Sequence, residues 1–187
     1  MENTEELLFI TPAADQLEEV RAYRQEFLNA GDDMDGTGPL RKCADPEEWL
    51  RRVDSYTDPA TVPPNLVQAT QFLCVRKTDG RILGMLQVRH TLNDYLREYA
   101  GHIGYSVRPS ERRKGYAKWM LQQALDFCRS IGLEKVMICC EPENEGSRRT
   151  ILSGGGVYKS TVFDPRHGIF LERYWIDLSG RDPKGEE

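Results

Sequence analysis

The residues most suggestive of chemistry form a short basic turn between an apolar run and a long amphipathic segment. Residues 107–117 read V-R-P-S-E-R-R-K-G-Y-A. A strand that ends in such a turn and opens a helix can hold a phosphate, because free backbone N–H groups and the helix dipole both favour negative charge there. Arg112, Arg113 and Lys114 would add positive side chains. The turn predicts a pyrophosphate site, with a solvated basic surface as the alternative.

The flanking sequence predicts the elements that would position this turn. Short apolar runs bounded by turn residues predict strands, and apolar residues at helical spacing after the turn predict a helix capped by Gly132. A glycine turn at 154–156 leads into a final hairpin. The predicted strands are 7–11, 72–76, 82–89, 102–107, 135–140, 157–163 and 169–178, and the predicted helices are 13–29, 46–53, 117–131 and 147–152.

Two common phosphate motifs are absent from the chain. It contains neither the G-x-x-x-x-G-K-[ST] loop nor a G-x-G-x-x-G segment after a strand. What remains is V-x-P-x-x-R-x-x-G-x-A, formed by Val107, Pro109, Arg112, Gly115 and Ala117. This pattern resembles the acetyl-CoA signature of the GNAT superfamily of N-acetyltransferases, and the order of elements over residues 72–178 resembles that superfamily too.

The resemblance implies an α/β fold of the α+β type. Its mixed, mostly antiparallel and twisted sheet would be flanked by helices and splayed between the motif strand and the next strand. The implied reaction moves an acetyl group from acetyl-CoA directly to an amine of a small molecule or protein. A non-catalytic acyl-CoA-binding module of the same fold is the alternative.

The resemblance also implies which residues contact acetyl-CoA, with no metal ion involved. A backbone N–H near residues 106–107 would polarise the thioester carbonyl. Asn144 matches an asparagine that contacts the pantetheine arm in the superfamily, although an asparagine after a strand is also a common helix cap. The implied contacts are Ser106, Val107, Arg112, Arg113, Lys114, Gly115, Tyr116, Ala117 and Asn144.

A base is needed because a primary amine, with a pKa of about 10.4, is protonated at neutral pH. Many GNAT enzymes have a glutamate at the start of the motif strand, and His102 occupies that place in this chain. If His102 is the base, its replacement by alanine should lower kcat/KM by roughly two to four orders of magnitude. The alternative is a histidine hydrogen-bonded to backbone groups at a strand end.

An acid for the departing thiolate is harder to assign. Many family members have a tyrosine seven residues beyond the asparagine, where this chain has Ile151. Tyr105 or Tyr158 could replace it, or the thiolate could leave unassisted. A cysteine nucleophile at Cys139 or Cys140 would instead give an acetyl-enzyme, but their apolar surroundings favour core packing.

Length and composition fit one enzyme domain over residues 1–178. Residues 1–70 would form acceptor-side helices and a loop, 71–178 the acetyl-CoA-binding core, and 179–187 a polar tail. Among 187 residues the net charge is −5, which argues against nucleic acid as a partner. Five cysteines in mostly apolar runs favour a reduced, cytoplasmic protein. No segment resembles a secretory leader or a membrane span.

The segment 31–38 is glycine-rich and acidic, and the sequence predicts a flexible loop there. The superfamily places the corresponding region beside the acceptor. Its negative charge, with that of nearby glutamates, predicts a cationic amine acceptor, against the alternative of a solvated surface. A homodimer is left open. The acidic residues are Asp32, Asp33, Asp35, Glu47 and Glu48.

Overall fold

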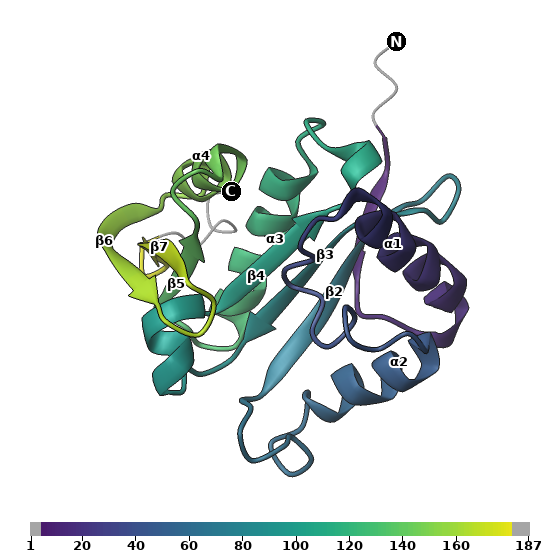
Figure 1. Ribbon diagram of the computed structural model, residues 1–187, viewed down its shortest axis with the longest axis horizontal. Coiled ribbons are helices and arrows are strands. Elements are labelled where there is room, and N and C mark those ends of the chain that lie inside the picture. The colour runs from purple at the N-terminus through teal and green to yellow at the C-terminus, as the bar shows by residue number, and fades with distance from the viewer. Residues whose placement is uncertain (1–4, 181–187) are drawn as a thin grey trace, which may run out of the picture.

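A four-stranded antiparallel sheet lies between two layers of helices in the computed structural model, which describes residues 5–180 (Figure 1). Helices α1 (Leu17–Ala30) and α2 (Pro46–Ser55) cover one face, and α3 (Tyr116–Ser130) covers the other. The strands, in spatial order, are β1 (Leu7–Ile10), β2 (Ala69–Arg76), β3 (Ile82–Arg89) and β4 (Ile103–Val107).

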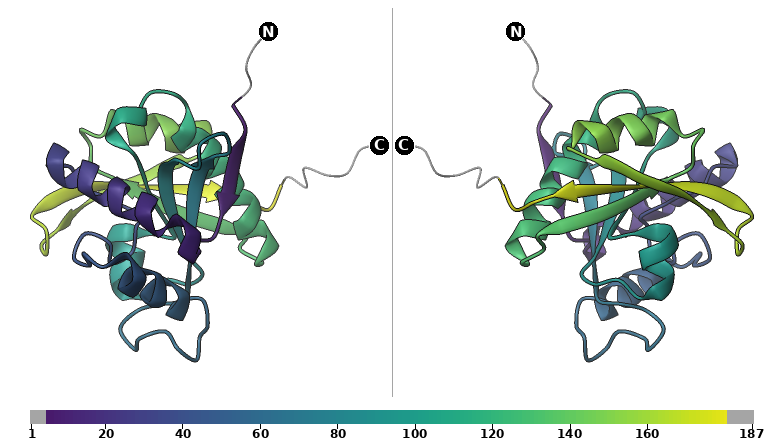
Figure 2. Two further views of the ribbon diagram at one scale, coloured as in Figure 1. Left: turned by 90° about the vertical axis from the view of Figure 1, so that its right-hand side faces the viewer. Right: turned by 90° about the vertical axis from the view of Figure 1, so that its left-hand side faces the viewer.

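A separate three-stranded sheet follows α3, in the spatial order β5-β7-β6. Its two outer strands are both antiparallel to β7. Just before β4, Gly101 forms a bridge with Ile138 of β5, and β4 and β5 then diverge into different sheets (Figure 2). The predicted fold class and the predicted splay are therefore confirmed. The elements are β5 (Lys135–Cys140), α4 (Glu145–Ser153), β6 (Val157–Asp164) and β7 (Ile169–Asp177).

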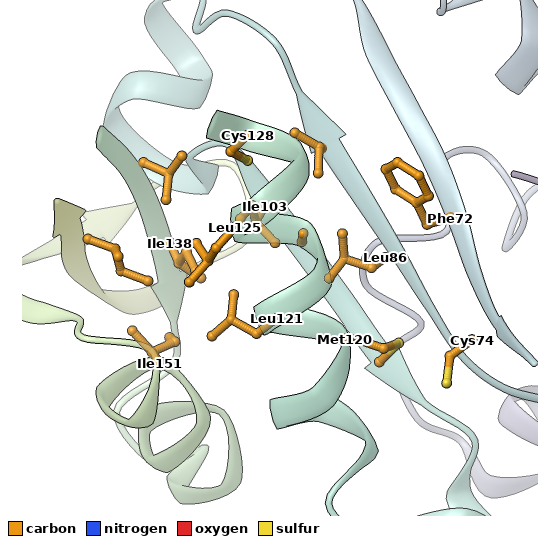
Figure 3. Packing of buried hydrophobic residues seen from close by; sticks show 14 of the residues in the cluster. Phe72, Cys74, Leu86, Ile103, Met120, Leu121, Leu125, Cys128, Ile138 and Ile151 are labelled. Atoms are coloured by element: carbon orange, nitrogen blue, oxygen red, sulfur yellow. The ribbon is translucent and has the colours of Figure 1, made fainter. Parts of the chain in front are cut away.

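Strand alternation divides the apolar residues between two cores. On β2, Phe72 and Cys74 pack toward α3, whereas Leu73 and Val75 pack toward α1 and α2. Figure 3 shows the α3 side of this arrangement, where Leu121 and Leu125 lie near side chains of β5 and α4. One amphipathic helix thereby joins the two sheets. It holds the motif turn at its own N-terminus, beyond the C-terminal end of β4.

The predicted elements match the observed ones, with differences at their ends. The predicted first helix opens with a separate helical turn, η1 (Ala14–Gln16), and β2 begins three residues before the predicted strand because Gln71 is polar but buried. A helical turn, η2 (Leu96–Ala100), was not predicted, since five residues are too few to show an apolar period. Only Ser179 and Gly180 of the predicted tail lie within the described residues.

The acidic loop is anchored rather than flexible, which corrects the sequence-based prediction. The Trp49 indole is fully buried and donates to the Thr37 carbonyl at 2.7 Å, and Gln71 Nε2 donates to the Gly36 carbonyl at 2.7 Å. Gly36 has φ +69°, and a Cβ on it would lie 2.1 Å from the Gly104 carbonyl oxygen. The loop therefore lies directly on β4.

Candidate active site

The predicted cradle is formed by backbone at the N-terminus of α3. Gly115 is the N-cap residue with φ +90°, and a Cβ on it would meet no heavy atom within 4 Å. The first amides of a helix have no partner within it. Arg113, before the cap, also has a positive φ of 64°. The turn thus exposes consecutive N–H groups to open space, an arrangement suited to a phosphate.

Two of the three basic side chains in the turn are paired with carboxylates. Arg112 Nη1 lies 2.6 Å from Asp32 Oδ2, and Lys114 Nζ lies 2.7 Å from Glu111 Oε2. Glu111 is buried and also contacts arginines of β2 and the β2–β3 turn. The positive charge of the turn is therefore partly neutralised, and Arg112 and Lys114 fasten the turn as well as charging it. Arg113 is exposed.

The β4 backbone distinguishes the two predicted carbonyl-binding residues. Backbone hydrogen bonds join Arg89 N to the His102 carbonyl and Arg108 N to the Leu83 carbonyl. Because every second residue of an antiparallel strand directs its N–H toward the neighbouring strand, the Ser106 amide also points toward β3. The backbone N–H and carbonyl of Val107 point away from β3, and the carbonyl accepts a hydrogen bond from Arg112 Nε at 3.2 Å. The prediction for the carbonyl-binding amide is thereby narrowed to Val107.

The side chain of Ser106 also makes a structural hydrogen bond. The Tyr23 hydroxyl, fully buried on α1, lies 3.0 Å from both the Ser106 carbonyl oxygen and Ser106 Oγ. Ser106 itself is buried. Ser106 thus fixes α1 to the motif strand, and its contact with the cofactor stays a prediction.

Tyr105 and Asn144 converge on one residue of α4. The Tyr105 hydroxyl lies 2.8 Å from Ser147 Oγ, and Asn144 Oδ1 accepts from the Ser147 amide at 3.0 Å. Asn144 is thus the helix cap that the sequence allowed, while its side chain stays exposed. Burial raises the pKa of Tyr105, which keeps its hydroxyl protonated at neutral pH. The pair links β4 to α4 across the divergence of the sheets.

His102 forms the hinge of that divergence. Its amide donates to the Met137 carbonyl at 2.8 Å, and its Nδ1 accepts from the Met137 amide at 2.9 Å. The ring nitrogen thus accepts the hydrogen bond that a backbone carbonyl would accept in a regular strand pair, at the point where β4 and β5 diverge. Because Nδ1 accepts, the neutral ring carries its proton on Nε2. Burial, with the nearby Arg89 charge, lowers the pKa of His102 to about 4. This geometry favours a positioning role over the predicted role as a base.

Substituting His102 should separate these two roles. His102→Ala leaves the Met137 amide buried without a partner and should cost about 1–3 kcal/mol of folding free energy. His102→Asn, whose Oδ1 can accept in place of Nδ1, should keep both the stability and the pH dependence of kcat/KM. A loss of two or more orders of magnitude in kcat/KM for a folded His102→Asn protein would restore the base role.

The same residue predicts a pH dependence of stability. Because the folded-state pKa lies below its ordinary value of 6.5, the unfolded chain binds the proton more readily. The free energy of unfolding should therefore fall as pH drops from about 6.5 to about 4, by up to about 3 kcal/mol. Chemical denaturation across this range would measure it, with His102→Asn as the variant that lacks this contribution.

Asp35 and Arg89 flank the middle of β4. A Cβ on Gly104 would lie 3.3 Å from the Gly36 Cα and 3.6 Å from Arg89 Nη2. Asp35, next to Gly36, reaches solvent, yet burial raises its pKa, and Asp33 and Glu141 add to that effect while Arg89 opposes it. Sequence reasoning included Asp35 only as one of several loop acids and missed Arg89, which looks like an ordinary polar strand end.

The surroundings of the cysteines, Ile151 and Tyr158 favour packing or surface roles over catalytic ones. Burial raises the pKa of the Cys139 thiol to about 12 and that of Cys140 to about 11, so neither is a thiolate at neutral pH. Ile151 is fully buried in the core beside α3. Tyr158 lies on the edge strand β6 with its hydroxyl 2.8 Å from Thr161 Oγ1. Of the two tyrosines predicted as the acid, Tyr105 is the one that lies on the motif strand itself.

Two kinds of feature are absent from residues 5–180. No helix in this part of the chain is long and apolar enough to cross a bilayer. The same residues contain no group of three or more His, Cys, Asp or Glu side chains placed to hold a metal ion.

Comparison with known proteins identifies the family. The acetyltransferase (GNAT) family profile matches residues 38–152, which include the motif turn and the strands β2 to β5. The chain therefore belongs to the GNAT acetyltransferase family, and it is an acyltransferase enzyme. This confirms the resemblance inferred from the motif. A search of curated protein sequences gives no significant match.

Solved structures of similar fold cover nearly the whole chain. The ribosomal-protein-S5-alanine acetyltransferase from Vibrio fischeri matches with a TM-score of 0.74 and 17% identity, over 97% of this chain and 98% of that one. RimL, a ribosomal L7/L12 α-N-protein acetyltransferase in complex with coenzyme A, matches with a TM-score of 0.71 and 12% identity, over 96% and 97%. YncA from Salmonella typhimurium, with acetyl-CoA, matches with a TM-score of 0.65 and 14% identity, over 97% and 99%.

Proposed function

We propose that this enzyme transfers an acetyl group from acetyl-CoA directly to an amine that binds between Asp35 and the divergence of β4 and β5. The observation that carries the proposal is the seating of the acidic loop on β4. Gly36 packs against Gly104 and Tyr105, which lie three and two residues before Val107, respectively. An amine held by Asp35 would then lie beside the strand that presents the Val107 amide.

Acetyl-CoA fits the residues of the cradle. Its pyrophosphate would bind the amides at the start of α3, with Arg113 as the basic side chain of the turn that has no carboxylate partner among the described residues. The thioester would lie where β4 and β5 diverge, so that the Val107 amide can stabilise negative charge on the carbonyl oxygen. The structures of YncA and RimL contain acetyl-CoA and coenzyme A, respectively, which supports the same co-substrate for this chain.

Asp35 is the proposed base. A carboxylate whose pKa is raised holds a proton more strongly and is a better base toward an ammonium group than an ordinary aspartate. It is also the one aspartate of the loop, among the described residues, with no basic nitrogen within 4.0 Å, because Asp32 pairs with Arg112 and Asp33 with Arg41. The acidic loop thus offers one carboxylate that is not in an ion pair. We therefore expect it to bind a single ammonium group of the acceptor.

Tyr105 is the proposed acid. Its protonated hydroxyl lies on the same strand as Val107 and shares a hydrogen bond with Ser147. It could donate to the departing sulfur if that atom lies between β4 and α4. The high pKa of Cys139 and Cys140 supports direct transfer over an acetyl-cysteine intermediate. All five cysteines are free.

Initial-rate kinetics with two substrates test direct transfer. Double-reciprocal plots at several fixed amine concentrations should intersect, because both substrates must be bound before the acetyl group moves. Cys139→Ala should give the same intersecting pattern with a similar kcat. Parallel lines in the wild type, or an acetylated Cys139 detected by mass spectrometry after incubation with acetyl-CoA alone, would contradict the proposal.

A further inference from the structure

Arg89 is a desolvated cation without a carboxylate partner. It ends β3, where it is half-buried, and burial lowers the pKa of its guanidinium. Among the described residues no carboxylate oxygen lies within 4.0 Å of it. Within the described part of the chain, the Arg89 guanidinium makes one hydrogen bond, from Nη1 to the Gly101 carbonyl at 3.1 Å. Since desolvating an unpaired charge is unfavourable, such a group points to a ligand that pairs with it.

The other donors of Arg89 remain available. A guanidinium carries several N–H donors in a fixed plane, and it can bind a carboxylate through two of them. Buried nitrogens without a partner occur in the described residues on Arg81, Arg108 and Arg129, but not on Arg89. Nε and Nη2 of Arg89 therefore reach solvent. Nη2 lies beside Gly104, on the part of β4 that the acidic loop covers.

Asp35 is the one carboxylate, among the described residues, whose charge affects the pKa of Arg89. The neighbours that affect its charge are Asp35, Cys139 and Tyr95, and burial raises the pKa of both Cys139 and Tyr95 to about 12, so these two are neutral. Asp35 and Arg89 lie more than 4.0 Å apart, because they form no ion pair. One negative and one positive charge thus stand near each other, each unpaired.

We propose that the acceptor is a free amino acid, whose carboxylate binds Arg89 while its ammonium group binds Asp35. This inference rests on the proposed function and adds the substrate class. An amino acid carries the opposite pair of charges, separated by a short and fixed distance, and would neutralise both protein groups at once. A simple polycation would leave Arg89 unpaired, and an N-terminal peptide amine has a neutral carbonyl where the free carboxylate would be.

The test compares free amino acids with their carboxamides, which differ only in the group that Arg89 would bind. Wild-type enzyme with acetyl-CoA is assayed for acetylated product on both series and on peptides with a free N-terminus and an amidated C-terminus. We expect at least one amino acid to be acetylated with a kcat/KM roughly 100-fold or more above that of its carboxamide. The difference should lie mainly in KM.

Variants of Arg89 show whether that preference comes from this side chain. Arg89→Gln should reduce the ratio of kcat/KM for the amino acid to that for its carboxamide to about one, whereas Arg89→Lys should keep part of the preference. Arg97→Gln, an exposed arginine on the nearby η2 turn, should leave the ratio unchanged. A merely structural Arg89 would instead lower both rates together and leave the ratio intact.

The possible outcomes separate this inference from the proposed function. If amides, peptides or simple amines are acetylated as well as amino acids, or Arg89→Gln lowers both series equally, the amino-acid class is overturned and acetyl transfer stands. If acetyl-CoA binds but none of the amines is acetylated, the proposed function fails and this inference fails with it.

Discussion

Gly115→Val should weaken acetyl-CoA binding by roughly 100-fold or more, because it removes the backbone approach on which two or more charge-assisted hydrogen bonds depend. Valine is strained at the φ of +90° found there, and its side chain would project into the open space at the start of α3. Isothermal titration with acetyl-CoA measures the change in Kd.

Gly132 provides a matched control at the other end of the same helix. It has φ +84°, and a Cβ on it also meets no heavy atom within 4 Å. Gly132→Val should therefore carry a similar strain of about 1–3 kcal/mol and leave the Kd for acetyl-CoA unchanged. If the two variants bind acetyl-CoA equally well, the cradle is not at Gly115.

Asp35→Asn should lower kcat/KM for the amine by roughly two to four orders of magnitude, since it removes the proposed base. The wild-type rate should fall as pH drops through the raised pKa of Asp35, because the carboxyl group becomes protonated. In the variant this acid limb should disappear, and the deficit should shrink as pH rises toward the pKa of the amine itself. The pH dependence of kcat/KM for both proteins checks this.

Asp33→Asn is the control for charge alone. Asp33 lies two residues away, is exposed, and pairs with Arg41 at 3.5 Å. Its replacement should change kcat/KM by no more than a few fold, and neither variant should alter the Kd for acetyl-CoA. Asp32 is a poor control because its ion pair with Arg112 ties it to the cradle. Equal losses from Asp33→Asn and Asp35→Asn would indicate a field effect and no specific base.

The motif turn and its flanking elements could be predicted because their signals are local. Strand runs, helical spacing and the glycines of the turn each lie within a short window of sequence. The bounds of β3 and β5 were predicted to the residue, and the splay followed from the resemblance to the GNAT superfamily. Gly115 and Gly132, predicted as phosphate-turn and capping residues, both have the positive φ that such positions require.

The chemistry of the site was harder to predict because it depends on contacts between distant parts of the chain. Tyr23 reaches Ser106 across 83 positions, and the ring of His102 replaces a backbone carbonyl opposite Met137, 35 positions away. Composition cannot distinguish Asp35 from Asp32 and Asp33, since their difference lies in which arginine each one meets. Arg89 gave no signal at all, because a polar residue at a strand end is common.

Amine-dependent release of coenzyme A, with the acetylated amine identified by mass, is the most direct test of acetyl transfer with Asp35 as the base. Wild-type enzyme with acetyl-CoA should release thiol only when an acceptor amine is present, in equal amount to the product. Asp35→Asn should bind acetyl-CoA with wild-type affinity while releasing thiol at less than about a hundredth of the rate. Undiminished turnover in Asp35→Asn would show that Asp35 is not the base, and acetyl-CoA binding by the wild type without transfer to any amine would rule out the acetyl transfer itself.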